Sequence, residues 1–306
     1  MKKINNQSLT IIGGSGFIGK SIIDSFNKGL LKKYFIENIN IICRQPFRFK
    51  KKNNNLYKLN IFYSNIRTLK KLPKSDLYIY AAESTNVNFY KKKNNKKNIN
   101  HHKESIKNFV KLVSKYNNSK VLYVSSGSVN YKKYTKSSNS YKKLYAKLKI
   151  FSENQIKKLF KFKIKTSIAR CYSFIGPHLP TNSHYAIGNF LYGAKYNNKI
   201  IIKKKNKVIR SYMYSDDMVE WLITILKNSK KKTTIYNVGS DESIELFDLA
   251  KKITQLFKDK VLISKEGYES KKVDKYVPII RKTKNDLKLK ILYNLSDSLK
   301  RCLKFI

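Results

Sequence analysis

The sequence predicts an α/β protein with a doubly wound parallel sheet and a smaller C-terminal lobe. Two observations support this fold class. Short apolar runs alternate with segments of helical periodicity along the first half of the chain, as expected for strands joined by crossover helices. The first of these apolar runs also ends in three spaced glycines. At 306 residues, the chain is long enough for one large α/β domain and a smaller lobe.

The glycine loop, Gly13-x-x-Gly16-x-x-Gly19, joins an expected strand at Leu9–Ile12 to a helical pattern that opens at Lys20. The first glycine permits a tight turn, the second lets a pyrophosphate approach the backbone, and the third lets the helix pack close to the strand. The helix N-terminus adds free N–H groups that favour an anion. We therefore expect a Rossmann-like dinucleotide site that uses Gly13, Gly16, Phe17, Ile18 and Gly19.

The rest of the expected sheet follows the glycine loop in order. Strands are predicted at residues 38–43, 56–61, 76–82 and 121–124, and a helix is predicted over residues 105–116. A later strand near residues 235–238 is expected to return to the main sheet. We place a dinucleotide-binding domain at residues 1–175 and the smaller lobe at residues 176–306.

The residues at the strand ends bear on the cofactor. Sheets that bind NAD usually carry an acid at the end of the second strand, where it bonds the adenosine ribose hydroxyls. Here that strand ends with Cys43 and Arg44, so a cation stands where a 2′-phosphate could bind, which favours NADP. Ala81 and Ala82 end the fourth strand with small side chains, which allow the backbone to approach a ligand.

The residues that carry a chemical pattern are Ser126, Tyr145 and Lys149. Tyr145 and Lys149 are four residues apart, which places them on one face of a helix. An ammonium close to a phenol favours the phenolate, so such a tyrosine can exchange a proton with a sugar or alcohol oxygen. Ser126 ends the preceding strand, and its hydroxyl can hold the same oxygen. Tyr141 precedes Tyr145 by four residues and leaves the register of the pattern open, and chance matches are expected among 22 tyrosines.

The order of these motifs resembles the extended short-chain dehydrogenase/reductase family, the NAD-dependent epimerases and dehydratases that act on nucleotide sugars. The resemblance covers nearly the whole chain. Beyond the glycine loop and Tyr145-x-x-x-Lys149, it rests on residues 76–82, Ser125-Ser126 before Val129, Glu153, residues 169–177, 186–190, 210–217 and 236–240, and Val277-Pro278 followed by Arg281.

The resemblance implies roles for individual residues. Tyr145 would be the acid/base, Lys149 its partner and a ribose ligand, and Ser126 the third member of the site. Asn189, Arg210 and Arg281 would hold the diphosphate of the substrate in the smaller, substrate-binding lobe, because an arginine fork suits a pyrophosphate. The family also implies NAD or NADP as cofactor, a nucleoside diphosphate sugar as substrate, and a homodimer.

Several positions depart from the family pattern. Asn60 stands at the cofactor-binding position where the third strand usually carries an acid. The asparagine that the family carries in the helix before Ser105 is left unassigned, because gapless counting places His102 there and Asn100 lies nearby. Gly127 and Ser128 stand where a 4,6-dehydratase needs an Asp–Glu pair, and Ser128 replaces the cysteine of GDP-fucose-type enzymes. Dehydration is therefore disfavoured. Two reactions stay open: epimerisation at C4 and reduction of a 4-keto sugar.

The charge of the chain leaves a different class of function open. The formal net charge is +47, from 66 Lys and Arg against 19 Asp and Glu, and such a surface attracts polyanions. A catalytically degenerate relative that binds nucleic acid or senses NAD(P) is therefore the alternative. The lysines form scattered runs without interleaved aromatic residues, which favours a solvated basic surface over a specific nucleic-acid site.

The remaining composition bounds the environment of the protein. Three widely separated cysteines indicate a reducing compartment without a disulfide framework. The histidines and cysteines lack metal-ligand spacing, so no metal is expected. No apolar run is long enough to cross a bilayer, and we expect a cytoplasmic protein without a membrane span.

Overall fold

The structure is a computed structural model that describes residues 6–44, 59–84, 87–90, 95–130, 140–180, 185–202, 206–257, 260–265 and 270–305. The chain divides into two compact units. Unit 1 comprises Met1–Cys171 and Val219–Tyr236, and unit 2 comprises Tyr172–Met218 and Asn237–Ile306. Among the described residues, no helix is both long enough and apolar enough to pass through a membrane.

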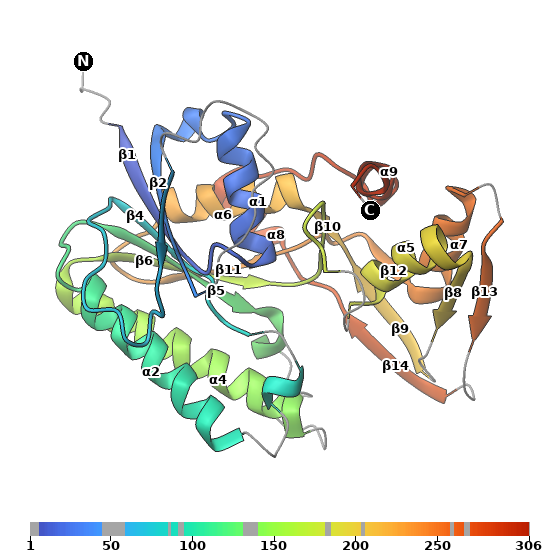
Figure 1. Cartoon of the computed structure of the whole chain (residues 1–306), viewed down its shortest axis with the longest axis horizontal. Helices are drawn as coiled ribbons and strands as arrows, with labels where there is room; N and C mark the ends of the chain where they lie inside the picture. The colour runs from blue at the N-terminus through green and yellow to red at the C-terminus, as the bar shows by residue number, and fades with distance from the viewer. Residues whose placement is uncertain are drawn as a thin grey trace. The chain divides into compact units, whose positions relative to one another are not determined.

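Unit 1 is built on a seven-stranded sheet with the order β11-β6-β5-β4-β1-β2-β3 (Figure 1). Every pairing from β3 across to β6 is parallel. The carboxyl ends of these strands therefore share one edge, the edge where doubly wound sheets bind ligands. The predicted α/β fold class is confirmed. The strands are β1 (Gln7–Ile12), β2 (Ile36–Cys43), β3 (Leu59–Tyr63), β4 (Leu77–Tyr80), β5 (Lys120–Ser126), β6 (Lys165–Cys171) and β11 (Thr234–Val238).

Helices cover both faces of this sheet. Figure 1 shows α2 (Asn95–Val113) and α4 (Ser140–Lys157) along one face, and α1 (Phe17–Asn27) and α6 (Ser215–Lys227) along the other. The buried side chains of α2 and α4 form one apolar cluster with residues of β4, β5 and β6, among them Phe109, Ile156 and Tyr80. Short 3₁₀ turns lie at η1 (Lys32–Tyr34), η3 (Val87–Tyr90), η5 (Gly127–Asn130) and η6 (Lys158–Phe162).

Several element boundaries differ from those expected from the sequence, among them those of α1, α2 and β3. α1 begins at Phe17 rather than Lys20, because Gly16 is its N-cap and the third glycine lies inside its first turn. α2 begins at Asn95, ahead of the expected residue 105, since its polar first turns hide the apolar period that starts at Ile106. β3 includes Leu59–Tyr63, and residues 56–58 of the expected third strand lie outside the described part of the chain.

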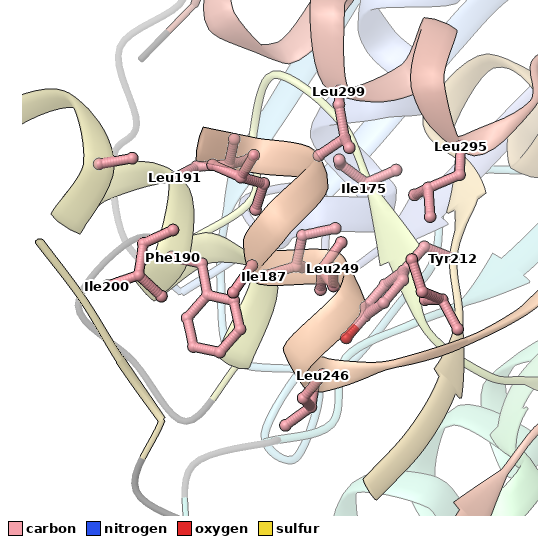
Figure 2. Packing of buried hydrophobic residues seen from close by; sticks show 14 of the residues in the cluster. Ile175, Ile187, Phe190, Leu191, Ile200, Tyr212, Leu246, Leu249, Leu295 and Leu299 are labelled. Atoms are coloured by element: carbon pink, nitrogen blue, oxygen red, sulfur yellow. The ribbon is translucent and has the colours of Figure 1, made fainter. Parts of the chain in front are cut away.

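Unit 2 combines helices with small sheets around its own core. Its sheets have the orders β12-β9-β14, β10-β7 and β13-β8. Figure 2 shows the core, in which residues from α5, α7 and α9 pack around Ile175 and Tyr212. The elements are β7 (Phe174–Ile175), α5 (Ala186–Asn197), β8 (Lys199–Ile202), β9 (Asn206–Ser211), β10 (Met213–Tyr214), β12 (Ser243–Glu245), α7 (Leu246–Gln255), β13 (Leu262–Lys265), β14 (Ser270–Tyr276), α8 (Arg281–Leu287) and α9 (Leu295–Leu303).

Candidate active site

The glycine loop lies between the ends of β2 and β4. Gly13 donates its N–H to the Ile42 carbonyl at 2.8 Å, and the Ala81 N–H donates to the Ile12 carbonyl at 2.8 Å. Gly13 has a φ of +97°, and a Cβ on it would come within 2.7 Å of the Ala81 carbonyl carbon. Only glycine fits this turn, because a side chain would be strained by the backbone angle and would strike β4.

The other two glycines of the motif have different surroundings. A Cβ at Gly19 would lie 2.5 Å from the Gly14 Cα, so this glycine lets the first turn of α1 pack on the loop. A Cβ at Gly16 would meet only the Gly13 carbonyl oxygen, at 3.5 Å, which is ordinary contact. Nothing in the described protein therefore requires glycine at position 16. A bound phosphate, which needs close access to the backbone, is a physical reason for a glycine at position 16.

The start of α1 has the electrostatics of an anion site. Its first turn contains no acidic residue, and its N-cap, Gly16, makes no side-chain hydrogen bond. As at any helix N-terminus, the first N–H groups have no carbonyl partner within the helix, and the positive dipole end here meets no carboxylate in the first turn. Phe17 and Ile18 are half-buried at this turn. The residues of the loop fit a dinucleotide.

Arg44 and Asn60 differ in how their side chains are placed. Arg44 is exposed directly after the carboxyl end of β2. The Asn60 side-chain amide donates to Asn40 Oδ1 at 3.1 Å, and Asn40 Nδ2 in turn donates to Ser75 Oγ at 3.1 Å. Thr10 on β1 also contacts Ser75, with 2.7 Å between the hydroxyl oxygens. Asn60 thus joins a polar row that runs across the sheet, and its cofactor role stays a prediction.

Tyr145 and Lys149 lie on one face of α4, as their spacing predicts. The Lys149 Nζ is 5.7 Å from the centre of the Tyr145 ring and donates a hydrogen bond to the Val124 carbonyl at 3.0 Å. This bond ties the lysine to β5, whose last residue is Ser126. Tyr145 is half-buried and packs edge-on against Tyr90, with 5.4 Å between the ring centres.

Ser126 and Ser128 bring two hydroxyl groups to the end of β5. Both residues are buried, at 7 % and 8 % exposed. The Ser126 Oγ accepts a hydrogen bond from the Ser128 N–H at 3.2 Å. The Ser128 hydroxyl is buried and has no hydrogen-bond partner among the described residues. A buried hydroxyl of this kind is usually satisfied by a ligand or a water molecule.

A buried acid, Glu83, is the ion-pair partner of Lys149. Their charged atoms are 2.6 Å apart, and the two side chains are 5 % and 6 % exposed. Burial lowers the pKa of a lysine, but the Glu83 carboxylate outweighs this effect and raises the pKa of Lys149 above its ordinary value. Burial likewise opposes ionisation of Glu83, yet the charges of Lys149 and His102 hold the pKa of Glu83 below its ordinary value.

A second buried acid, Glu153, lies one turn further along α4. Arg170 on β6 donates two hydrogen bonds to it, from Nε to Oε1 at 3.0 Å and from Nη2 to Oε2 at 2.8 Å. Ser125 on β5 donates to the same Oε1 at 2.6 Å. Arg170 also donates to the Asn130 side chain. The helix that carries Tyr145 is thereby fixed to β5 and β6.

His102 on α2 lies beside the same helix. Its Nε2 is 2.9 Å from the Ser152 hydroxyl and 3.3 Å from the Leu148 carbonyl. It is also 3.6 Å from Glu83 Oε1. His102 therefore contacts the backbone next to Lys149 and lies beside the Glu83 carboxylate.

The three residues expected to bind the diphosphate belong to unit 2: Asn189 lies on α5, Arg210 on β9 and Arg281 on α8. Asn189 and Arg281 are exposed. Arg210 is engaged within the unit, because its Nη1 donates to the Asp274 carbonyl at 2.7 Å and its Nη2 to Asp274 Oδ2 at 3.1 Å. A diphosphate at Arg210 would have to share this guanidinium with Asp274, so the substrate role of these three residues stays a prediction.

The chain matches the model of the NAD dependent epimerase/dehydratase family over residues 9–239. This match spans the glycine loop, Tyr145, Lys149 and β11. The chain belongs to this family.

Individual members of the epimerase/dehydratase family resemble the chain to different degrees. The dTDP-D-glucose 4,6-dehydratase of Dictyostelium discoideum is 28 % identical over 285 residues, and the match covers 82 % of this chain but 62 % of that protein. The human dTDP-D-glucose 4,6-dehydratase is 31 % identical over 98 residues, which cover 32 % of this chain and 27 % of that protein. The chain therefore spans less than two thirds of the length of these relatives.

Solved structures share the fold over the whole chain. The UDP-glucose 4-epimerase of Thermotoga maritima with UDP-glucose has a TM-score of 0.78 at 16 % identity, with 97 % of this chain and 98 % of that chain covered. The enzyme WbmF of Bordetella bronchiseptica with NADH has a TM-score of 0.79 at 15 % identity, with 100 % and 93 % covered.

Glu83 is the functional candidate that sequence reasoning missed. It follows Ala82 directly and is one of only 19 acids in the chain, at the end of an apolar strand. An acid at a strand end of a doubly wound sheet is a usable signal, because ligands bind at that edge. Its partner Lys149 is far away in the sequence, so the pairing itself could not be predicted.

Proposed function

We propose that this member of the epimerase/dehydratase family catalyses NAD(P)-dependent epimerisation of a nucleotide sugar, or reduction of a 4-keto nucleotide sugar. The observation that carries the proposal is the placement of Lys149. Its ammonium is held charged by Glu83, is bonded to β5 two residues before Ser126, and lies next to the Tyr145 ring. A phenol beside a fixed ammonium is a suitable proton donor and acceptor for a sugar hydroxyl.

Each residue has a role in this proposal. Bound NAD(P) supplies the hydride exchange with the sugar carbon. Tyr145 takes the proton from the sugar hydroxyl or returns it to the carbonyl oxygen, and the Lys149 charge stabilises the phenolate. Ser126 orients the same oxygen through a hydrogen bond. The glycine loop, Ala81 and Ala82 bind the dinucleotide.

The end of β5 bears on the reaction type. Gly127 has no side chain and Ser128 has only a hydroxyl, so neither can remove a proton from carbon as a carboxylate would. This favours epimerisation or ketone reduction over dehydration, although the Dictyostelium and human relatives are called 4,6-dehydratases. The two favoured reactions differ in cofactor use, since an epimerase leaves the cofactor unchanged over a cycle and a reductase consumes it.

The proposed substrate is a nucleoside diphosphate sugar. The relatives support this class, because they are named for dTDP-D-glucose and UDP-glucose. Asn189, Arg210 and Arg281 are proposed to bind its nucleotide diphosphate, since guanidinium groups bind phosphates bidentately. The family resemblance also supports a homodimer, which sizing of the purified protein by light scattering would test.

The proposed cofactor preference is NADP, because Arg44 is an exposed cation after β2 where an acid would select NAD. Titration of the purified protein with NADPH and NADH decides this point. Arg44→Ala should weaken NADPH binding more than NADH binding. Equal or tighter binding of NADH by the unaltered protein would remove Arg44 from the proposal.

The decisive experiment is a substrate panel. The protein is incubated with UDP-, dTDP-, GDP- and CDP-sugars and their 4-keto forms, and reduced cofactor and sugar products are followed. Tyr145→Phe should lower the rate on a confirmed substrate by about 10²–10⁴-fold, the usual contribution of a general acid/base. Tyr141→Phe, one turn earlier on α4, is the matched control and should keep the rate. If Tyr145→Phe keeps the rate, Tyr145 is not the acid/base.

A further inference from the structure

We infer that Glu83 is the positioning residue of this site: its carboxylate fixes the Lys149 ammonium at the strand ends and keeps it protonated while the site works. The inference rests on the proposed function of Lys149 and adds a residue that the family pattern of the sequence did not supply.

Both carboxylate oxygens of Glu83 face a polar group of the protein. Oε2 lies 2.6 Å from the Lys149 Nζ as an ion pair without hydrogen-bond geometry, and Oε1 accepts a hydrogen bond from the Tyr123 hydroxyl at 2.7 Å. The His102 Nε2 lies 3.6 Å from Oε1. These partners come from α4, β5 and α2, so three elements fix the position of one carboxylate. A surface acid has no such constraint.

Lys149 has few groups besides Glu83 that can stabilise its charge. Its side chain is 6 % exposed, so the protein and not the solvent must stabilise the charge. Besides Glu83, the described structure gives it the Val124 carbonyl at 3.0 Å. Glu153, one turn away, is already held by the two hydrogen bonds from Arg170. In the described part of the chain, Glu83 is therefore the carboxylate within ion-pair distance of Lys149.

A buried ion pair of this kind contributes little to folding stability by itself. Desolvation offsets most of the attraction between buried charges, and apolar residues of similar volume often serve equally well. The pair lies at the strand ends, and its ammonium is 5.7 Å from the ring centre of Tyr145, whose phenolate needs a cation. A role in fixing that cation explains its position, whereas a purely structural role does not require it there.

The surrounding titratable groups do not replace Glu83. Tyr80 and Tyr123 are buried phenols whose pKa is raised by burial, so both stay neutral. Burial raises the pKa of Cys171 to about 12, so its thiol is neutral as well. His102 and Tyr145 are the other groups that face the pair. Without Glu83, the described surroundings of Lys149 hold no other carboxylate within ion-pair distance, and a buried lysine then tends to lose its proton.

The test compares Glu83→Gln with the unaltered protein in the pH dependence of folding, which needs no substrate. A buried Lys149 with a lowered pKa binds one proton fewer in the folded state than in the unfolded state. Stability therefore rises with pH between this lowered pKa and the ordinary lysine pKa of about 10.4. The folding constant of Glu83→Gln, divided by that of the unaltered protein, should increase by up to about tenfold per pH unit between about pH 7 and 9.

Three further variants isolate the cause. Glu83→Gln combined with Lys149→Met should lose the slope, because the titrating group is gone. Glu83→Asp keeps the charge and should show little slope, and it serves as the readout if Glu83→Gln folds poorly. Glu104→Gln removes an exposed acid of α2 that pairs with Arg67. The ratio of its folding constant to that of the unaltered protein should stay constant across this pH range. A constant ratio for Glu83→Gln across this pH range would overturn the inference.

Kinetics on a confirmed substrate give the second readout. Glu83→Gln should lower kcat by at least tenfold, change KM less, and move the alkaline limb of the pH profile to lower pH by a unit or more. An unchanged kcat and pH profile would overturn the positioning role even if the folding slope is present. If the slope is present and the unaltered protein turns over no nucleotide sugar, the proposed function fails while the assignment of the Lys149 charge to Glu83 stands.

Discussion

Replacing the glycines of the loop one at a time should separate folding from cofactor binding. In Gly13→Ala, the new Cβ would lie 2.7–2.8 Å from backbone atoms of Ala81 and Ala82, and φ is +97°. A left-handed backbone costs an L-residue about 1–2 kcal/mol. Forcing a methyl group against backbone costs a further ~1–3 kcal/mol. We therefore expect Gly13→Ala to lower the free energy of unfolding by about 2–5 kcal/mol, a large part of the usual ~5–15 kcal/mol.

Gly16→Ala is the matched variant with the opposite outcome. Its Cβ would touch only the Gly13 carbonyl oxygen at 3.5 Å, and its φ of −79° suits any residue. Stability should change by no more than about 1 kcal/mol, the typical effect at an N-cap. The methyl group would occupy the space proposed for the pyrophosphate, so affinity for NADH or NADPH should fall at least tenfold, about 1.4 kcal/mol.

Both effects are measurable with the protein alone. Trp221, the single tryptophan, is fully buried in α6 and reports unfolding in urea by fluorescence. Cofactor affinity is measured by calorimetric titration of the folded variants. An unchanged urea midpoint for Gly13→Ala would refute the steric argument. A loss of stability in Gly16→Ala equal to that in Gly13→Ala would refute the view that position 16 is reserved for a ligand.

Three other predictions follow from contacts described above. Arg170→Met leaves Glu153, whose side chain is 3 % exposed, without its cation, so the free energy of unfolding should fall by about 3–5 kcal/mol. Arg67→Met is the control, because it breaks the exposed pair with Glu104, and it should change the free energy of unfolding by less than about 1 kcal/mol. Leu249→Ala in the core of unit 2 should cost about 2–5 kcal/mol in chemical denaturation followed by circular dichroism, and Leu262→Ala, 72 % exposed, about 0.5 kcal/mol or less. Burial raises the pKa of both Cys171 and Cys302 to about 12, and the reactive form of a cysteine is the thiolate. A thiol reagent at pH 8 should therefore label these two cysteines only after unfolding. Fast labelling of the native protein at pH 8 would contradict their burial.

The sequence predicts the fold class and several strands of unit 1 because their signals are local. The apolar runs at β1, β2, β4 and β5 and the glycine loop each lie within a few residues, and a parallel sheet follows from their alternation with helices. The polar N-terminal half of α2 was missed because lysine and asparagine there give no apolar period. Its helix is fixed instead by the packing of later residues such as Phe109.

The partners of the charged residues could not be predicted in the same way. Glu83 meets Lys149, and Glu153 meets Arg170, only after three strands have paired in order. The family resemblance implies that Arg210 binds a diphosphate, and the sequence gives no sign that the register of β9 and β14 brings Asp274 to the same guanidinium. Such contacts depend on strand register, which a single sequence specifies only through the completed fold.

The charges along α4 restrict the position of the helix on the sheet. Tyr145, Lys149 and Glu153 follow one another at one-turn intervals, and the sheet offers an anion, Glu83, to the lysine and a cation, Arg170, to the glutamate. A slip of the helix by one turn, about 5.4 Å, would set Lys149 against Arg170 or Glu153 against Glu83. Like charges would then meet in a buried environment. The alternation of charge along α4 therefore allows only one position of the helix along its own axis. Apolar ridges repeat every turn and tolerate such a slip, whereas this pattern of charges does not.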